Sequence, residues 1–219
     1  MLPTVTRRVF GLVALAGIAR PAIALADDGP TPAPGGDAIT AKQVVFQDAM
    51  RKLWEDHIAW TRLFIVDFAA GSPETDATTQ RLLQNQVDIG DAVTPYYGAA
   101  AGGKLTELLK QHILEAGDVL AAAKAGDAAK VDAASKRWYG NANAIAAFLH
   151  GANPDAWPPA DMQAMMSGHL DDTLAEAVAH LMGDWAADIA AYDNVHRQIL
   201  GMADMLSAGI IRQFPAQFA

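Results

Sequence analysis

The chain has 219 residues, with 25 acidic and 16 basic side chains, a net charge of −9 and no cysteine. The excess of acid argues against nucleic-acid binding, because phosphate contacts need clustered Lys and Arg. The lack of cysteine excludes disulfides, thiolate metal sites, iron–sulfur clusters and covalently attached c-type haem.

The first 26 residues have the features of an export signal. Thr6-Arg7-Arg8-Val9-Phe10 is typical of a twin-arginine signal, with a plain Sec signal as the alternative, and Ala24-Leu25-Ala26 resembles a cleavage site. The apolar run between them is too short for an ordinary transmembrane helix. We therefore predict an exported, periplasmic protein that is not stably inserted in a membrane once residues 1–26 are removed. Residues 27–38, rich in Pro and Gly, are expected to be a flexible linker.

The rest of the chain, residues 39–219, predicts helices only. Apolar residues recur at spacings of three and four, strand alternation is absent, and Gly or Pro interrupts the pattern about every 25 to 30 residues. Six short-linked helices predict one all-α domain, an up-and-down antiparallel bundle. The expected helices cover residues 40–70, 73–93 (or from 76), 103–125, 127–150, 158–182 and 184 to about 210.

Local signals place several of the chain's turns and ends. Thr40 and Gln43 are spaced as a capping box, and Gly71 is a helix stop. Pro95 is expected to lie beyond the end of the second helix. Residues 214–218 are too few for a helix of their own and are expected to fold back as an aromatic plug.

Four histidines lie in the apolar stripes of four different predicted helices, near the midpoint of each: His57, His112, His169 and His196. Midpoints share one level in a bundle, so the four imidazoles are expected to form one buried layer. Burying several polar rings together needs a common reason, and a metal ion is the leading one. A layer of hydrogen-bonded His, Asn and Asp without metal is the alternative. The segments around His112 and His169 resemble each other too weakly to indicate a duplication.

Acids and amides at helical spacing extend the candidate site. Asp193 precedes His196 by three residues, so both can face one ion, and Asp193 is expected as a ligand or as a partner that orients the ring. The ligands expected first are His57, His112 and His196. A nitrogen-rich set of this kind suits zinc, copper or iron. The polar layer is expected to include Asn85, Asp88, Glu115, Asn141 and Asp172. Alternatively, these side chains lie on solvent-exposed flanks of their helices, or they are buried and fix the register of one helix against another.

Several segments carry a resemblance to a family of small exported bacterial proteins: LWEDHIAWTR at 53–62, RLLQNQVDIG at 81–90, Asn153-Pro154, and YDNVH at 192–196 through QFP at 213–215. The resemblance covers nearly all of the chain after the signal and implies export and an all-helical domain. Automatic names in that family disagree with one another; one of them, glycosyltransferase, would require a nucleotide-sugar fold that this sequence does not suggest. The resemblance supplies no activity and no catalytic residues.

These observations predict an exported helical bundle with a buried His-rich, metal-binding site, whose role in storage, sensing or redox chemistry stays open. One alternative is a ferritin-like oxidoreductase using iron or manganese, although the chain lacks paired Glu-x-x-His motifs and has more His than Glu in its stripes. Another is a non-enzymatic scaffold or interaction domain with a structural polar core. Phosphate loops, G-x-S-x-G and H-E-x-x-H are absent, so no catalytic residue is predicted.

Overall fold

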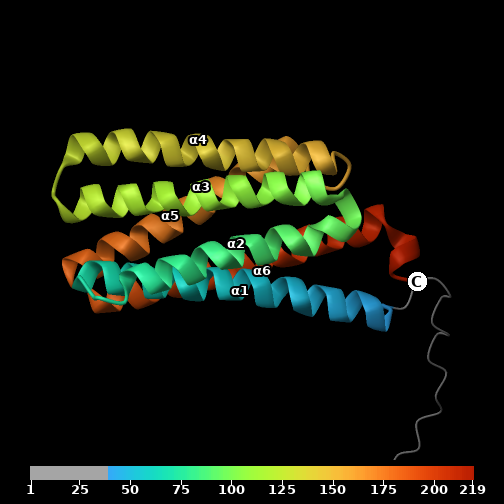
Figure 1. Cartoon of the computed structure of the whole chain (residues 1–219), viewed down its shortest axis with the longest axis horizontal. Helices are drawn as coiled ribbons and strands as arrows, with labels where there is room; N and C mark the ends of the chain where they lie inside the picture. The colour runs from blue at the N-terminus through green and yellow to red at the C-terminus, as the bar shows by residue number, and fades with distance from the viewer. Residues whose placement is uncertain (1–38) are drawn as a thin grey trace, which may run out of the picture. The chain divides into compact units, whose positions relative to one another are not determined.

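A computed structural model describes residues 39–219, which form six helices and no strand. Consecutive helices run in opposite directions, so α1, α3 and α5 are parallel to one another (Figure 1). The predicted all-α, up-and-down bundle is therefore confirmed; the predicted signal and linker lie outside the described residues. The helices are α1 (Ala41–Ala70), α2 (Thr75–Tyr97), α3 (Ala99–Lys124), α4 (Ala128–Ala152), α5 (Pro159–Met182) and α6 (Trp185–Gln213), followed by the short 3₁₀ helix η1 (Pro215–Gln217).

The first helix begins and ends as its sequence predicts. The Thr40 hydroxyl accepts from the backbone N–H of Gln43 at 3.2 Å, and the Gln43 side chain accepts from the backbone N–H of Thr40 at 3.1 Å. Gly71 ends α1 in the left-handed conformation, with φ 68°. These caps hold the helix that carries His57 in a fixed register.

The end of α2 differs from the prediction. The helix continues through Pro95 to Tyr97, and α3 begins at Ala99, earlier than expected. Pro95 is tolerated because a missing N–H in the last turn costs one bond, and the Thr94 carbonyl still accepts from Gly98 at 2.9 Å. Gly98 alone joins the two helices, with φ 82°, a backbone angle that favours glycine.

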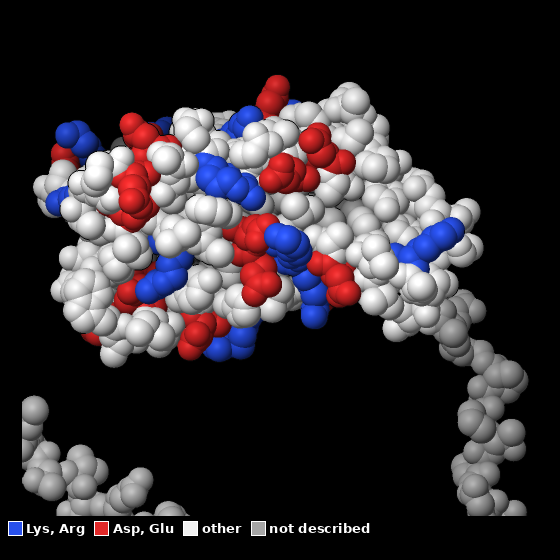
Figure 2. Space-filling view, turned by 60° about the horizontal axis from the view of Figure 1, so that its bottom comes forward, with Lys and Arg blue, Asp and Glu red and all other residues white. Residues whose placement is uncertain are grey.

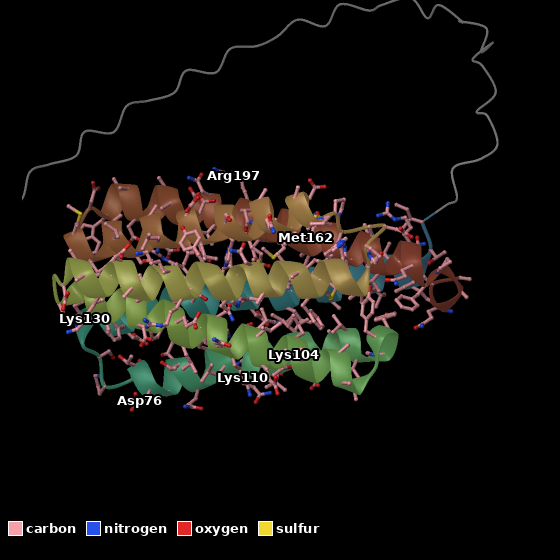
Figure 3. The ribbon with its side chains drawn as sticks, turned by 90° about the horizontal axis from the view of Figure 1, so that it is seen from above. Asp76, Lys104, Lys110, Lys130, Met162 and Arg197 are labelled. Atoms are coloured by element: carbon pink, nitrogen blue, oxygen red, sulfur yellow. The ribbon has the colours of Figure 1, made fainter. Side chains whose placement is uncertain are left out.

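The six helices pack in chain order, and α6 returns to pack against α1, which closes the bundle. Three antiparallel hairpins result: α1–α2, α3–α4 and α5–α6. Large apolar side chains fill the interior, whereas charged side chains such as Asp76 and Arg197 point outward (Figure 3). Figure 2 shows acidic and basic side chains interspersed over one face, with no continuous basic patch on it. No helix in residues 39–219 is both long and apolar enough to cross a membrane.

The C-terminal segment folds back onto the bundle. Phe218 is buried, and its ring centroid lies 5.1 Å from that of Phe46 and 5.5 Å from that of Tyr96. The Thr40 hydroxyl also donates to the Phe218 carbonyl at 2.6 Å. The expected aromatic plug is present, and it ties the end of the chain to the start of α1.

Candidate functional site

Three of the four predicted histidines come together inside the bundle. His57, His112 and His169 are only 3%, 3% and 5% exposed. The ring centroid of His169 lies 5.8 Å from that of His57 and 6.4 Å from that of His112. They belong to the parallel helices α1, α3 and α5, so equivalent positions along these helices reach one level. We call these three residues the histidine layer.

In two hairpins the Nδ1 atom of the histidine faces a side-chain amide from the second helix. His112 Nδ1 lies 2.9 Å from Asn141 Oδ1, and His169 Nδ1 lies 3.2 Å from Gln198 Oε1. Each amide nitrogen donates to a backbone carbonyl, at 3.1 Å for Asn141 and 3.0 Å for Gln198. That bond fixes the amide with its oxygen toward the ring. Nδ1 must therefore carry the proton, and Nε2 keeps its lone pair.

The first hairpin differs, because an amide nitrogen faces its ring. Asn85 donates to the carbonyl of Leu53 at 3.0 Å, and Gln86 Nε2 lies 3.2 Å from His57 Nδ1 and 3.1 Å from Asn85 Oδ1. Gln86 Nε2, which also donates to the Leu82 carbonyl at 2.8 Å, cannot accept a hydrogen bond, so its contact with the ring does not place the proton of His57 on Nδ1. Hydrogen bonding to both amides acts to raise the pKa of His57, against the larger effect of burial. Asn85 and Asn141 thus lie in the polar layer where the sequence predicts them, whereas Gln86 and Gln198 were missed.

The three hairpins repeat one geometric plan. In each hairpin, the residue whose side-chain amide lies next to the Nδ1 atom follows the histidine by 29 residues in the sequence. In every hairpin an amide nitrogen donates to the carbonyl four residues before the histidine, at Leu53, Leu108 and Met165. The weak sequence similarity around His112 and His169 is one part of this plan. The common 29-residue spacing from His to Gln or Asn is the signal that could have found the missed glutamines.

All three histidines are held in the neutral form. Burial lowers the pKa of His112 to about 3 and that of His169 to about 4, and the nearby imidazole of His169 contributes to the low pKa of His112. Burial, followed by the nearness of His169 and His112, holds the pKa of His57 well below its usual range. The layer therefore presents uncharged imidazoles at physiological pH.

His196 does not belong to the layer, and the expectation that four histidines converge is wrong for it. Its side chain is 37% exposed, and its Nε2 lies 2.9 Å from Glu55 Oε1 on the surface between α6 and α1. Val195 takes the buried position instead, and the neighbouring Asp193 is exposed. Asp193 is thus placed in solvent rather than beside the three rings.

The cause lies in the first half of α6, because the second half buries its apolar residues Ile199, Ala203 and Leu206. Trp185 and Ile189, which share the helical spacing of His196, are 59% and 58% exposed, whereas Asp188 is buried. Arg62 donates to both carboxylate oxygens of Asp188, at 2.7 and 2.8 Å, and also to Glu176 at 2.7 Å. A buried carboxylate needs such a partner, so this contact sets which face of α6 turns inward.

The other predicted acids interact elsewhere. Asp88 lies 3.6 Å from Arg81, Glu115 accepts from Gln111 at 2.9 Å, and Asp172 is half-buried. No carboxylate in residues 39–219 is hydrogen-bonded to a ring of the histidine layer. Within the same residues, no three His, Cys, Asp or Glu side chains are already spaced as ligands of one metal ion.

Two buried tryptophans border the layer. The ring centroid of Trp54 lies 5.8 Å from that of His57, and that of Trp138 lies 5.4 Å from that of His112. Their indole N–H groups and Gln86 Oε1 are buried and have no hydrogen-bond partner among the described residues. Because an unpaired buried polar group costs about 1–3 kcal/mol, these three atoms would be stabilised by a hydrogen-bond partner.

The fold and this layer define the class of protein as a six-helix bundle with three buried, neutral histidines at mid-height. Comparison with protein-family models found no match, and comparisons with curated proteins and with solved structures found none either. The functional argument therefore rests on the geometry of the layer.

Proposed function

We propose that the protein binds one metal ion through the Nε2 atoms of His112 and His169, with His57 as the third ligand. The observation that carries the proposal is the pairing of His112 and His169 with an amide oxygen at Nδ1. A metal-binding histidine typically gives its other ring N–H to a hydrogen-bond acceptor, which fixes the tautomer and the orientation of the ring. The amides of α4 and α6 supply that acceptor here.

The protonation state of the layer supports the same proposal. A metal ion binds only unprotonated imidazole, and the low pKa values of His112 and His169 mean that no proton has to be displaced near neutral pH. The hydrogen bonds of the three rings within residues 39–219 all involve Nδ1. A purely structural layer would gain from a second bond at Nε2, because unpaired buried polar atoms are costly.

Metal binding requires a small contraction of the layer. With metal–nitrogen bonds of about 2.0–2.1 Å, two rings on a tetrahedral ion have centroids about 5 Å apart. The centroid of His169 lies 5.8 Å from that of His57 and 6.4 Å from that of His112, so each of these two pairs must approach by about 1 Å. Three protein ligands leave a fourth coordination position open.

The donor set favours zinc, copper or iron over magnesium, calcium or manganese, which prefer oxygen ligands. A ferritin-like di-iron centre is less suited to this site, because its bridging carboxylates have no counterpart beside the rings. The two most buried acids, Glu176 and Asp188, are paired with Arg62 instead. With the signal predicted at residues 1–26, we propose that the metal-bound protein acts after export, in the periplasm.

The test is metal content and thermal stability of untagged protein lacking residues 1–26. Wild type should bind one equivalent of Zn²⁺ or Co²⁺ per chain and melt at a higher temperature with metal than with EDTA. His112→Gln and His169→Gln should lose both effects, whereas the surface control His196→Gln should retain them. Circular dichroism of each variant in EDTA verifies that it is folded. A melting temperature unaffected by zinc, copper, cobalt and iron would leave the layer as a structural polar core.

A further inference from the structure

A small cavity lies one helical turn from the histidine layer, on the side toward the C-terminal ends of α1, α3 and α5. Its volume is about 30 Å³. Thr61, Ala116 and Thr173, each four residues after one of the three histidines, form the wall nearest the layer. Four residues of helix correspond to a rise of about 6 Å. Trp138 also lines the cavity, and it is the tryptophan that borders His112.

The walls of the cavity are effectively apolar. Besides the two threonines, its lining consists of aliphatic and aromatic side chains. The hydroxyl of Thr61 donates to the His57 carbonyl at 2.8 Å, and that of Thr173 donates to the His169 carbonyl at 2.8 Å. Because both hydroxyl protons are engaged by the backbone, neither threonine needs a partner inside the cavity. A space of this kind favours an apolar occupant over water.

The cavity exists because the third hairpin departs from the common plan. Eight residues after the histidine, the first two hairpins carry Ile65 and Leu120, and the third carries only Ala177. One residue earlier, the third hairpin has Glu176, whose carboxylate bonds to Arg62. Both differences remove apolar volume at the same level of the bundle.

We propose that this cavity binds a small apolar molecule of diatomic size, such as dioxygen, beside the histidine layer. One water needs about 10–15 Å³, so a volume of about 30 Å³ suits two or three atoms and excludes larger organic molecules. Val178, which is 39% exposed, is part of the lining and connects the cavity with the surface of α5. The chemical use of the gas rests on the proposed metal site, whereas its binding does not require the metal.

A second cavity, of about 20 Å³, provides an internal comparison. It is lined by Met50, Val93, Leu149 and Met166 among others, and it lies on the opposite side of the histidine layer. Val119 and Leu174 line only the first cavity. The methyl groups of Val93 and Leu149 therefore report on the second cavity, and those of Val119 and Leu174 on the first.

The experiment is methyl NMR of the metal-free protein under xenon pressure, followed by dissolved dioxygen, whose paramagnetism broadens nearby signals. Xenon should shift the Val119 and Leu174 methyl signals saturably, and dioxygen should broaden the same signals. Ala177→Val, which fills the cavity, should abolish both effects. Ala175→Val, an exposed position on the same helix, should change neither.

Three results would overturn the inference: no saturable shift at Val119 and Leu174, shifts confined to Val93 and Leu149, or an undiminished response in Ala177→Val. The metal titration is independent of these outcomes. Gas uptake by a protein that binds no metal would support the cavity and overturn the metal site. Metal binding by a protein that takes up no gas would support the metal site and overturn the cavity proposal.

Discussion

Acid should destabilise the metal-free bundle as the pH falls below about 6.5, and only Glu176, whose pKa is raised by burial, acts in the opposite direction among the buried acids. Burial lowers the pKa of His112 to about 3 and that of His169 to about 4, whereas the unfolded chain titrates these groups near 6.5. Between these values the unfolded state binds more protons than the folded state. Stability is therefore complete above about pH 6.5 and falls as the pH is lowered toward 4.

The size of the effect follows from the same pKa values. One pKa unit corresponds to about 1.4 kcal/mol, so at pH 5, about 1.5 units below the unfolded pKa, each buried histidine costs about 2 kcal/mol. His112 and His169 together remove about 4 kcal/mol, and His57 acts in the same direction. Domains of this size have about 5–15 kcal/mol in total, so the loss is a large part of the stability.

Urea unfolding in EDTA, followed by circular dichroism at pH 7 and pH 5, measures this loss. Asp188 and Asp204, whose pKa values are lowered by Arg62 and Arg51, titrate mainly below pH 5. In His112→Gln the difference between the two pH values should shrink by about 2 kcal/mol, and in His196→Gln it should not change. A difference that is negligible in wild type, or the same in His112→Gln, would refute the reasoning.

Two further predictions concern the packing that positions the layer. Arg62→Met leaves the buried Glu176 without its partner and Asp188 with His180 alone, and it should lower the free energy of unfolding by about 3–5 kcal/mol. Arg51→Met, at an exposed ion pair, should change the urea midpoint little, and equal effects would contradict the assigned role of Arg62. A Cβ on Gly102 would lie 2.7 Å from the Gly90 carbonyl oxygen of α2, so Gly102→Ala should lower the thermal midpoint. Gly103→Ala meets nothing within 4 Å and should stabilise by about 1 kcal/mol; a destabilised Gly103→Ala would contradict this account of the α2–α3 contact.

The helices were predictable because their signals are local. Apolar spacing, the capping pair Thr40 and Gln43, and the stop at Gly71 lie within a few residues of the ends that they determine. Pro95 was misjudged because proline is a strong breaker inside a helix but a mild one in the last turn. There, packing of Tyr96 against Phe46 and Phe218 favours continuing the helix.

The site was predictable only in helices where the apolar stripe alone determines which face turns toward the core. It does so for His57, His112 and His169, which all lie inside the bundle. For His196 the face is decided by Arg62, which is 126 residues away from Asp188 in the chain. Such a long-range ion pair has no local signature, so the apolar pattern of α6 misplaces its histidine.

The metal site is tested most directly by anomalous diffraction at the zinc absorption edge, on crystals of untagged protein grown with one equivalent of Zn²⁺. The account predicts one strong peak per chain within about 2.0–2.1 Å of Nε2 of His112 and His169 and of a ring nitrogen of His57, with the Nδ1 atoms of His112 and His169 still bonded to their amides. A peak only at surface groups such as His196 and Glu55, or no peak at the histidine layer, would contradict it.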